Sequence, residues 1–198
     1  MKYAFLIPMG QQMVPSLLFQ QWLPFQKWLV KNEDYAEICS VIGPSQVHTR
    51  NELLKSIDAE WYIWVDADIK FSIQQMRQLM DTNELFVAGW YARSSSEGDV
   101  HSSVGIKNSE GPGYTQLHPM EVYNKTDTFE CDWTALGFAK IHQTVINHLP
   151  EPYFTHKIIN EDLCAEDLSF CMDVYQHTKI KPKIIPSLNV GHIKWTIL

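Results

Sequence analysis

Apolar runs and amphipathic segments alternate along the 198-residue chain. The apolar runs are rich in aromatic and β-branched residues, which favour buried strands, whereas the amphipathic segments carry apolar residues at helical spacing. Strands are predicted at residues 3–7, 37–42, 61–65, 85–90 and 183–190. Helices are predicted at residues 13–31, 47–57, 72–80, 142–149 and 163–177. This order is typical of a three-layer α/β/α fold, in which helices cover both faces of a mainly parallel sheet.

The middle of the chain has a different pattern. Two polar, turn-rich stretches at residues 94–99 and 108–113 flank a short apolar stretch at 100–107, which predicts loops around a short strand. Between residues 117 and 133, β-type residues recur between turns, so we expect antiparallel strands added to the parallel core. Because no repeat or convincing linker divides the chain, residues 1–198 are predicted to form a single domain.

One strand ends in an unusual way. Residues 61–65 read Trp-Tyr-Ile-Trp-Val, and Asp66-Ala67-Asp68 follows at once. A run that is apolar at every position predicts a strand buried on both faces, as in a parallel sheet. Open α/β sheets bind ligands at the carboxyl ends of such strands. Two carboxylates there are costly unless a cation neutralises them, and a divalent cation carrying a diphosphate would do so.

Composition and charge narrow the possible classes of protein. Hydrophobic residues make up 45% of the chain and aromatic residues 12%, which excludes a disordered segment. A net charge of −7 argues against binding to nucleic acid by bulk electrostatics. Cys39, Cys131, Cys164 and Cys171 form no C-x-x-C pair, so we expect reduced thiols and a cytoplasmic setting. The N-terminal apolar run is too short for a signal peptide, and no stretch is long enough to predict a membrane span.

An acid pair is predicted to open the last helix. Glu166-Asp167 is followed by apolar residues at helical spacing, which places the pair in the first turn. A helix N-terminus stabilises a carboxylate, and such a carboxylate can remove a proton from an attacking hydroxyl. The ordinary alternative is a structural acid at a helix start, and the nearby Glu161-Asp162 competes for the role of base.

Further polar residues follow other predicted elements. His192 comes directly after the last strand, and an imidazole added to oxygen ligands shifts the preference of a site from Mg²⁺ toward Mn²⁺. Arg50 and Asn51 lie near the start of a helix, where side chains can reach a ligand above the sheet edge. Each residue has a structural alternative, because a lone histidine or a surface arginine is common in proteins without a ligand.

Taken in order, these motifs resemble the small GT-A-fold glycosyltransferases found in large viruses, bacteriophages and bacteria. The resemblance covers nearly the whole chain, although residues 134–138 depart from the Gly-x-Gly-Phe form of the family. It implies a GT-A (Rossmann-like) domain over residues 1–198. The motifs that carry it are Ile7-Pro8, the segment 49–54, the D-x-D motif at 65–68, the segment 87–93, Leu136-Gly137-Phe138, the segment 165–171 and Val190-Gly191-His192.

The resemblance also implies roles for individual residues. Asp68 and His192 would bind Mn²⁺ (or Mg²⁺), and Asp167 would be the base of an inverting transfer, with Glu166 as second choice. The residues implied at the nucleotide and its phosphates are Pro8, Arg50, Asn51, Asp66, Ala67, Asp68 and Lys194. The candidates to line the sugar or the acceptor are Trp90, Tyr91, Arg93, Trp133 and Gly137.

The implied function is transfer of a hexosyl or pentosyl group from a nucleotide-diphosphate sugar, with a UDP-sugar favoured, to an acceptor hydroxyl. The acceptor would be a glycan or a protein, or a hydroxymethylated base in phage DNA. The resemblance places the enzyme in the cytoplasm, which is the host cytoplasm for a viral protein.

Two other functions remain open at this point. One is a non-catalytic GT-A-like domain that binds a nucleotide sugar or a glycan, which would not need the acid pair. The other is a nucleotidyltransferase, which usually opens with a basic, glycine-rich phosphate loop. Residues 8–12 read Pro-Met-Gly-Gln-Gln and lack the basic residue.

Overall fold

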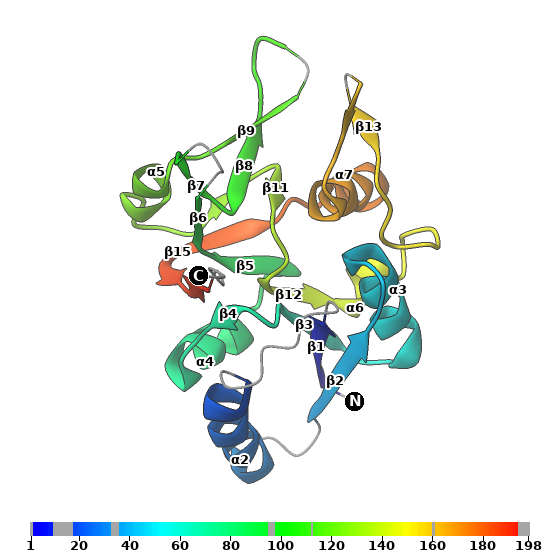
Figure 1. Ribbon diagram of the computed structural model, residues 1–198, viewed down its shortest axis with the longest axis vertical. Helices are drawn as coiled ribbons and strands as arrows, with labels where there is room; N and C mark the ends of the chain where they lie inside the picture. Colours follow the sequence, from blue (N-terminus) through cyan, green and yellow to red (C-terminus); the bar gives the residue numbers. More distant parts are fainter. Residues whose placement is uncertain are drawn as a thin grey trace.

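The computed structural model describes residues 2–9, 18–32, 36–94, 98–111, 113–159 and 161–193. Within them, a seven-stranded sheet of order β10-β15-β5-β12-β3-β1-β2 runs through the middle of the molecule (Figure 1). Its strands are β1 (Tyr3–Met9), β2 (Ala36–Ile42), β3 (Trp61–Val65), β5 (Phe86–Trp90), β10 (Phe129–Glu130), β12 (Phe138–His142) and β15 (Lys183–Asn189). Strands β1, β2, β3, β5 and β15 run in one direction, and β10 and β12 in the other. A mainly parallel sheet with added antiparallel strands is therefore confirmed.

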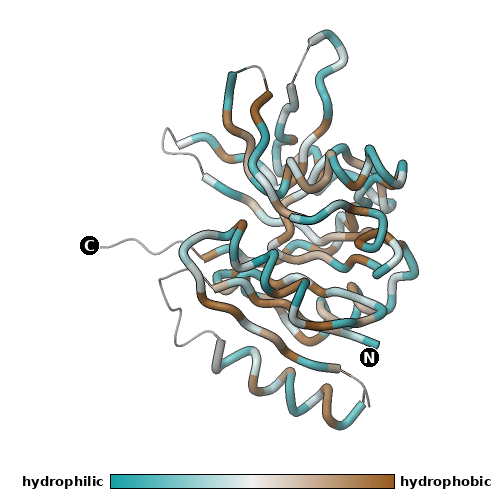
Figure 2. The backbone as a smooth tube through the Cα atoms, turned by 90° about the vertical axis from the view of Figure 1, so that its right-hand side faces the viewer, coloured by the Kyte–Doolittle hydropathy of each residue, from teal (hydrophilic) through white to brown (hydrophobic). Residues whose placement is uncertain are grey.

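Helices cover both faces of this sheet, as predicted. Successive residues of a strand point to opposite faces, so Leu6 and Trp64 pack into one core, and Phe5 and Ile63 into the other. The first core includes residues of α3, α6 and α7, and the second includes residues of α2 and α4. Figure 2 shows hydrophobic and hydrophilic residues alternating along α2, which is typical of a helix packed on one side. The helices are α2 (Leu23–Asn32, preceded by a π-helical turn, Leu18–Trp22), α3 (Gln46–Ser56), α4 (Ile73–Asp81), α6 (Gln143–Ile146) and α7 (Glu166–Thr178).

Short strands extend the molecule beyond the sheet. The β8–β9 and β13–β14 hairpins project side by side at the top of Figure 1. The bounds are β6 (Ala92–Ser94), β7 (Val100–Ser102), β8 (Val104–Lys107), β9 (Tyr114–Gln116), β11 (Trp133–Thr134), β13 (Ile158–Ile159) and β14 (Asp162–Leu163). A short helix, α5 (Pro119–Tyr123), lies within the segment 117–133, where only strands and turns were expected. Its start carries a capping box between His118 and Glu121, a local signal that favours a helix.

A buried lysine stabilises the junction between β12 and α4. Lys140 is 1% exposed, and its Nζ donates hydrogen bonds to the carbonyl oxygens of Met80 and Thr82 at the end of α4. The ammonium also lies 4.2 Å from the ring centroid of Trp61. Burial lowers the pKa of Lys140 to about 8. Below this pH the ammonium is charged, and its positive charge complements the carboxyl end of the α4 helix dipole.

Candidate active site

The two aspartates lie in the turn that follows β3. The backbone N–H of Asp66 donates to the carbonyl oxygen of Gly137 at 2.9 Å, and Ile69 N–H donates to the carbonyl oxygen of Asp66 at 3.0 Å. The side chain of Asp66 is 14% exposed and that of Asp68 is 38% exposed. The turn therefore directs Asp66 toward the protein interior and leaves Asp68 facing solvent.

A two-stranded ribbon brings the end of the chain to this turn. Strand β16 (Gly191–His192) pairs antiparallel with β4 (Ile69–Lys70), and Ile193 N–H donates to the carbonyl oxygen of Asp68 at 2.9 Å. As a result, His192 Nε2 lies 3.1 Å from Asp68 Oδ2. The pairing of these two residues, expected for a metal site, is thus present. Among the described residues, however, no group of three or more His, Cys, Asp or Glu side chains is arranged to hold a metal.

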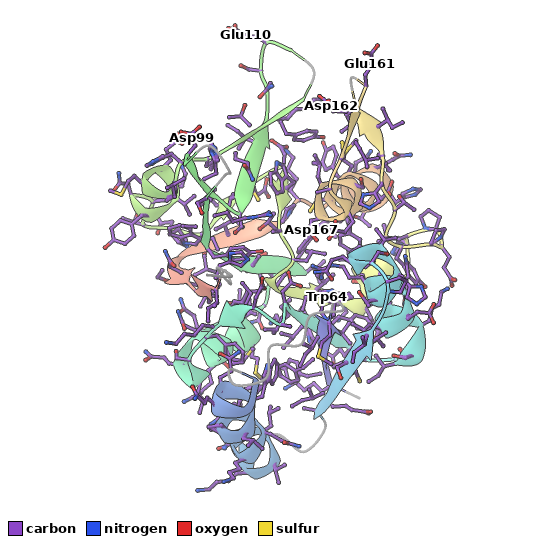
Figure 3. All side chains as sticks on the ribbon, viewed as in Figure 1. Trp64, Asp99, Glu110, Glu161, Asp162 and Asp167 are labelled. Carbon is purple, nitrogen blue, oxygen red and sulfur yellow. The ribbon has the colours of Figure 1, made fainter. Side chains whose placement is uncertain are left out.

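Arg50 connects this turn to the acid pair of α7. Its Nη2 lies 2.9 Å from Asp66 Oδ1 and 3.5 Å from Asp167 Oδ1, and its Nε lies 3.8 Å from Glu166 Oε1. The guanidinium is only 1% exposed. The structure therefore brings together four of the predicted site residues, and Arg50 is buried among the other three. Figure 3 shows Asp167 in the centre of the molecule, above Trp64.

Two aromatic rings pack against the Arg50 guanidinium, and the Asn51 amide holds one of them in place. The guanidinium carbon lies 5.2 Å from the ring centroid of Trp64 and 5.8 Å from that of Phe154. Asn51 fixes the second ring, because its amide donates to the carbonyl oxygen of Phe154 and accepts from the N–H of the same residue. Sequence reasoning missed Trp64 and Phe154 as parts of the site. Trp64 was assigned only to a buried strand, and no local signal links residue 154 to residue 50.

The environment of Asp167 disfavours its charged form. Burial raises its pKa to about 7, and the neighbouring carboxylates of Glu166 and Asp66 act in the same direction. The Arg50 guanidinium and a hydrogen bond from the Leu136 backbone oppose this rise. A carboxylate whose pKa lies near 7 is a stronger base than an ordinary carboxylate, and part of it is still ionised at neutral pH. Burial also raises the pKa of Asp66.

Tyr91 and Gly137 close the site around Asp66. The Tyr91 ring stacks on His192, with centroids 5.0 Å apart and an interplanar angle of 16°. A Cβ atom at Gly137 would lie 2.7 Å from Tyr91 Oη and 3.0 Å from Asp66 Oδ2. Burial raises the pKa of Tyr91 well above its usual value, and the charges of Asp66 and Asp167 add to this effect. Tyr91 is therefore a neutral hydroxyl, and only glycine fits at position 137.

The other predicted site residues lie in different environments. Pro8 is buried in β1 beside β2, and Ala67 is partly exposed in the turn between the two aspartates. Trp90 is 2% exposed, and its Nε1 donates to the carbonyl oxygen of Pro186 at 2.8 Å, so this ring belongs to the core.

Trp133 and Arg93 lie outside the carboxylate cluster. Trp133 is 8% exposed and covers Gly105 so closely that a Cβ atom there would lie 1.9 Å from its Nε1. Arg93 is exposed in β6. Lys194, expected near the phosphates, lies outside the described residues.

The four cysteines are unpaired, as expected: Cys39, Cys131, Cys164 and Cys171. No helix in the described ranges is long and apolar enough to cross a membrane.

Comparison with known proteins supports the fold. No protein-family model matches the chain, and no curated protein matches it significantly. Among solved structures, A197 from STIV aligns over 98% of this chain and 86% of its own, with a TM-score of 0.58 and 20% identity. GalNAc-T7, crystallised with UDP, GalNAc and Mn²⁺, aligns over 98% of this chain and 43% of its own, with a TM-score of 0.62 and 12% identity.

A third similar structure, residues 1–349 of TarS from S. aureus, aligns over 96% of this chain and 59% of its own, with a TM-score of 0.50 and 12% identity. This chain thus spans less than two thirds of both GalNAc-T7 and TarS. At such identities the likeness concerns the fold. The chain has a GT-A-like α/β fold, and the expected fold class is confirmed.

Proposed function

We propose that the chain is a metal-dependent glycosyltransferase that moves a sugar from a nucleotide-diphosphate sugar to an acceptor hydroxyl. The observation that carries the proposal is the convergence of Asp66, Asp68, His192 and Asp167 at the carboxyl end of β3. Ligands of open α/β sheets bind at this edge. One end of the cluster suits a cation, and the other suits a base.

Asp68 and His192 fit a divalent cation. A carboxylate oxygen and an imidazole nitrogen would together hold such a cation. The observed separation of Asp68 Oδ2 and His192 Nε2 is 3.1 Å. Two protein ligands suffice where the phosphates of a substrate supply others. When bound, the cation would neutralise the diphosphate and stabilise it as a leaving group, and the imidazole favours Mn²⁺ over Mg²⁺.

Asp167 is the proposed base of an inverting transfer. Its carboxylate removes the proton from the acceptor hydroxyl as the acceptor oxygen forms a bond to the anomeric carbon. The bond between that carbon and the phosphate oxygen breaks, and the nucleoside diphosphate leaves. A pKa near 7 suits a general base at neutral pH. Glu166 is the second choice, because it is the other carboxylate in the first turn of α7.

A UDP-sugar is the favoured donor, since GalNAc-T7, which has a similar fold, was crystallised with UDP and Mn²⁺. In this proposal Pro8, Ala67 and Lys194 contact the nucleotide or its phosphates. Asp66 faces the donor from the interior side of the turn. The fold likeness supports the general class of donor, and Tyr91 and Gly137, which shape the space beside Asp66, would line the sugar.

The acceptor would bind among the projecting hairpins. The turn of the β8–β9 hairpin lines a cavity of about 530 Å³, formed by residues 106–111 and Thr115. Figure 3 shows Glu110, Glu161 and Asp162 on the two hairpins beyond Asp167. These carboxylates would repel a phosphate backbone, so a glycan or a protein side chain is favoured over modified DNA.

A non-catalytic domain that only binds nucleotide sugars is the second candidate function. The acid pair Glu166-Asp167 in the first turn of α7, beside Arg50, argues against it, because binding alone does not need a base. A catalytic base, in contrast, is a role in which a buried carboxylate such as Asp167 is common.

A thermal-shift panel tests the proposal. The purified protein is heated with UDP, GDP, CDP or dTDP, each with Mn²⁺ and with EDTA. We expect UDP with Mn²⁺ to raise the melting temperature, and EDTA to remove the shift, because binding to the folded state stabilises it. Stabilisation that is the same in EDTA would contradict the metal site, and no shift with any nucleotide would contradict the donor class.

A further inference from the structure

The guanidinium of Arg50 has incomplete hydrogen bonding. It is 1% exposed, yet its Nε and Nη1 have no hydrogen-bond partner, and Asp167 Oδ1 has none either. A buried donor or acceptor without a partner destabilises the folded state. Such groups are rare in folded proteins and often mark a functional site. The unmatched atoms here belong to two residues that face each other.

The guanidinium lies between two sets of carboxylates. Nη2 makes a hydrogen bond to Asp66 at 2.9 Å, whereas the distances of 3.5 Å to Asp167 and 3.8 Å to Glu166 are too long. A shift of about 1 Å toward α7 would bring these atoms within hydrogen-bond distance.

The rings of Trp64 and Phe154 limit how the guanidinium can move. The guanidinium carbon lies 5.2 Å from the ring centroid of Trp64 and 5.8 Å from that of Phe154, so the two rings support Arg50 and limit how far it can turn outward. Because only 1% of its side chain is exposed, Arg50 is not accessible to a sugar donor that approaches from solvent. Its charge is available only to the carboxylates around it.

We propose that Arg50 is a positioning residue that couples Asp66, on the donor side of the site, to the base Asp167, without touching the donor itself. This inference rests on the proposed function. When a donor engages Asp66, the guanidinium shifts toward Asp167 and Glu166, meets the unpaired Oδ1 of Asp167 and fixes the base for the acceptor. A lysine cannot replace it, because the coupling needs several N–H groups in a planar fork.

The charged and titratable groups around Asp167 come from four elements. They are Arg50 of α3, Asp66 after β3, Tyr91 after β5, and Glu166 and Cys171 of α7. Only Arg50 among them is positive. Removing its charge should therefore move the midpoint of Asp167 to higher pH, whatever the substrate of the protein.

The test compares Arg50→Lys with Arg77→Lys, the same exchange on the exposed surface of α4. UDP affinity is measured by calorimetry in Mn²⁺, and turnover by release of UDP from a UDP-sugar. For Arg50→Lys we expect UDP affinity within about threefold of wild type and turnover about 100-fold lower, since a positioned base contributes about 10²–10⁴-fold. Arg77→Lys should change neither. If affinity falls as much as turnover, Arg50 contacts the donor and the inference is wrong; unchanged turnover would equally overturn it.

A second variant guards against loss of folding. Phe154→Leu keeps the Arg50 charge and removes one supporting ring, and it should lower turnover about tenfold with little change in UDP affinity. Unchanged turnover in this variant would contradict the proposed support of the guanidinium.

An activity-free measurement separates this inference from the proposed function. The Asp167 carboxyl is titrated by ¹³C NMR in wild type and in Arg50→Gln. If wild type neither binds nor hydrolyses a UDP-sugar, the proposed function fails. The titration then decides alone: a midpoint at higher pH in Arg50→Gln supports the coupling to Asp167, and an unchanged midpoint overturns it.

Discussion

Replacing the proposed base with its neutral isostere should stabilise the protein at alkaline pH. The pKa of Asp167 is raised from 3.8 to about 7 in the folded protein. The folded state therefore retains the proton more tightly than the unfolded chain, and this group contributes stability at low pH that is lost as pH rises to about 7. Each pKa unit corresponds to about 1.4 kcal/mol. About one of the three units is lost by pH 5 and all by pH 8, so Asp167→Asn should gain about 3 kcal/mol relative to wild type between these values.

Urea denaturation of both proteins at pH 5 and pH 8 measures this difference. Asp173→Asn is the matched control, because Asp173 lies on the same helix and pairs with Lys157. Loss of that partly exposed ion pair should lower stability by about 0–1 kcal/mol at pH 8. If Asp167→Asn shows no pH-dependent gain in unfolding free energy over wild type, burial does not raise the pKa of Asp167, and its pKa does not support a role as base.

Three further substitutions test other parts of the site and fold. Asp68→Asn should abolish Mn²⁺-dependent UDP binding in calorimetry with little change in melting temperature, since Asp68 is 38% exposed; retained Mn²⁺ dependence would refute its role as ligand. Gly137→Ala places a Cβ atom 2.7 Å from Tyr91 Oη and should lower UDP-sugar turnover at least tenfold, with partial recovery when Tyr91→Phe is added; normal turnover would contradict the tight packing. The lowered pKa of Lys140 makes the wild-type protein more stable as the pH rises above about 8, and Lys140→Met should lose this gain in stability. Melting temperatures that change in the same way in both proteins from pH 8 to about pH 10 would disprove it.

The strand ends could be predicted from the sequence because their signals are local. The all-apolar run 61–65 predicted a strand buried on both faces, and β3 is parallel to β1 on one side, although its other neighbour, β12, is antiparallel. The acid pair in the first turns of the last helix and the strand before His192 were equally local, although the helix begins at Glu166 and not at residue 163. The pairing of β4 with β16 then brings His192 to Asp68. Motif order along a doubly wound fold thus placed distant residues at one edge.

The burial of Arg50 could not be predicted in this way. The sequence places Arg50 near a helix start, where an exposed contact with a nucleotide is the natural expectation. Its environment depends on Trp64 and Phe154, which lie 14 and 104 positions further along the chain. The antiparallel strand β12 in the middle of the sheet was missed for a similar reason, because Lys140 interrupts its apolar pattern and finds its partners only in the folded chain.

Release of UDP from UDP-sugars is the decisive test of Asp167 as the base of a sugar transfer. Wild type and Asp167→Asn are incubated with Mn²⁺, a mixture of UDP-sugars and a set of glycan and glycoprotein acceptors, and UDP is quantified. We expect Mn²⁺-dependent UDP release that an acceptor accelerates, and loss of that acceleration in Asp167→Asn while UDP still binds. Acceptor-stimulated release that continues at the wild-type rate in Asp167→Asn would contradict the assignment of the base.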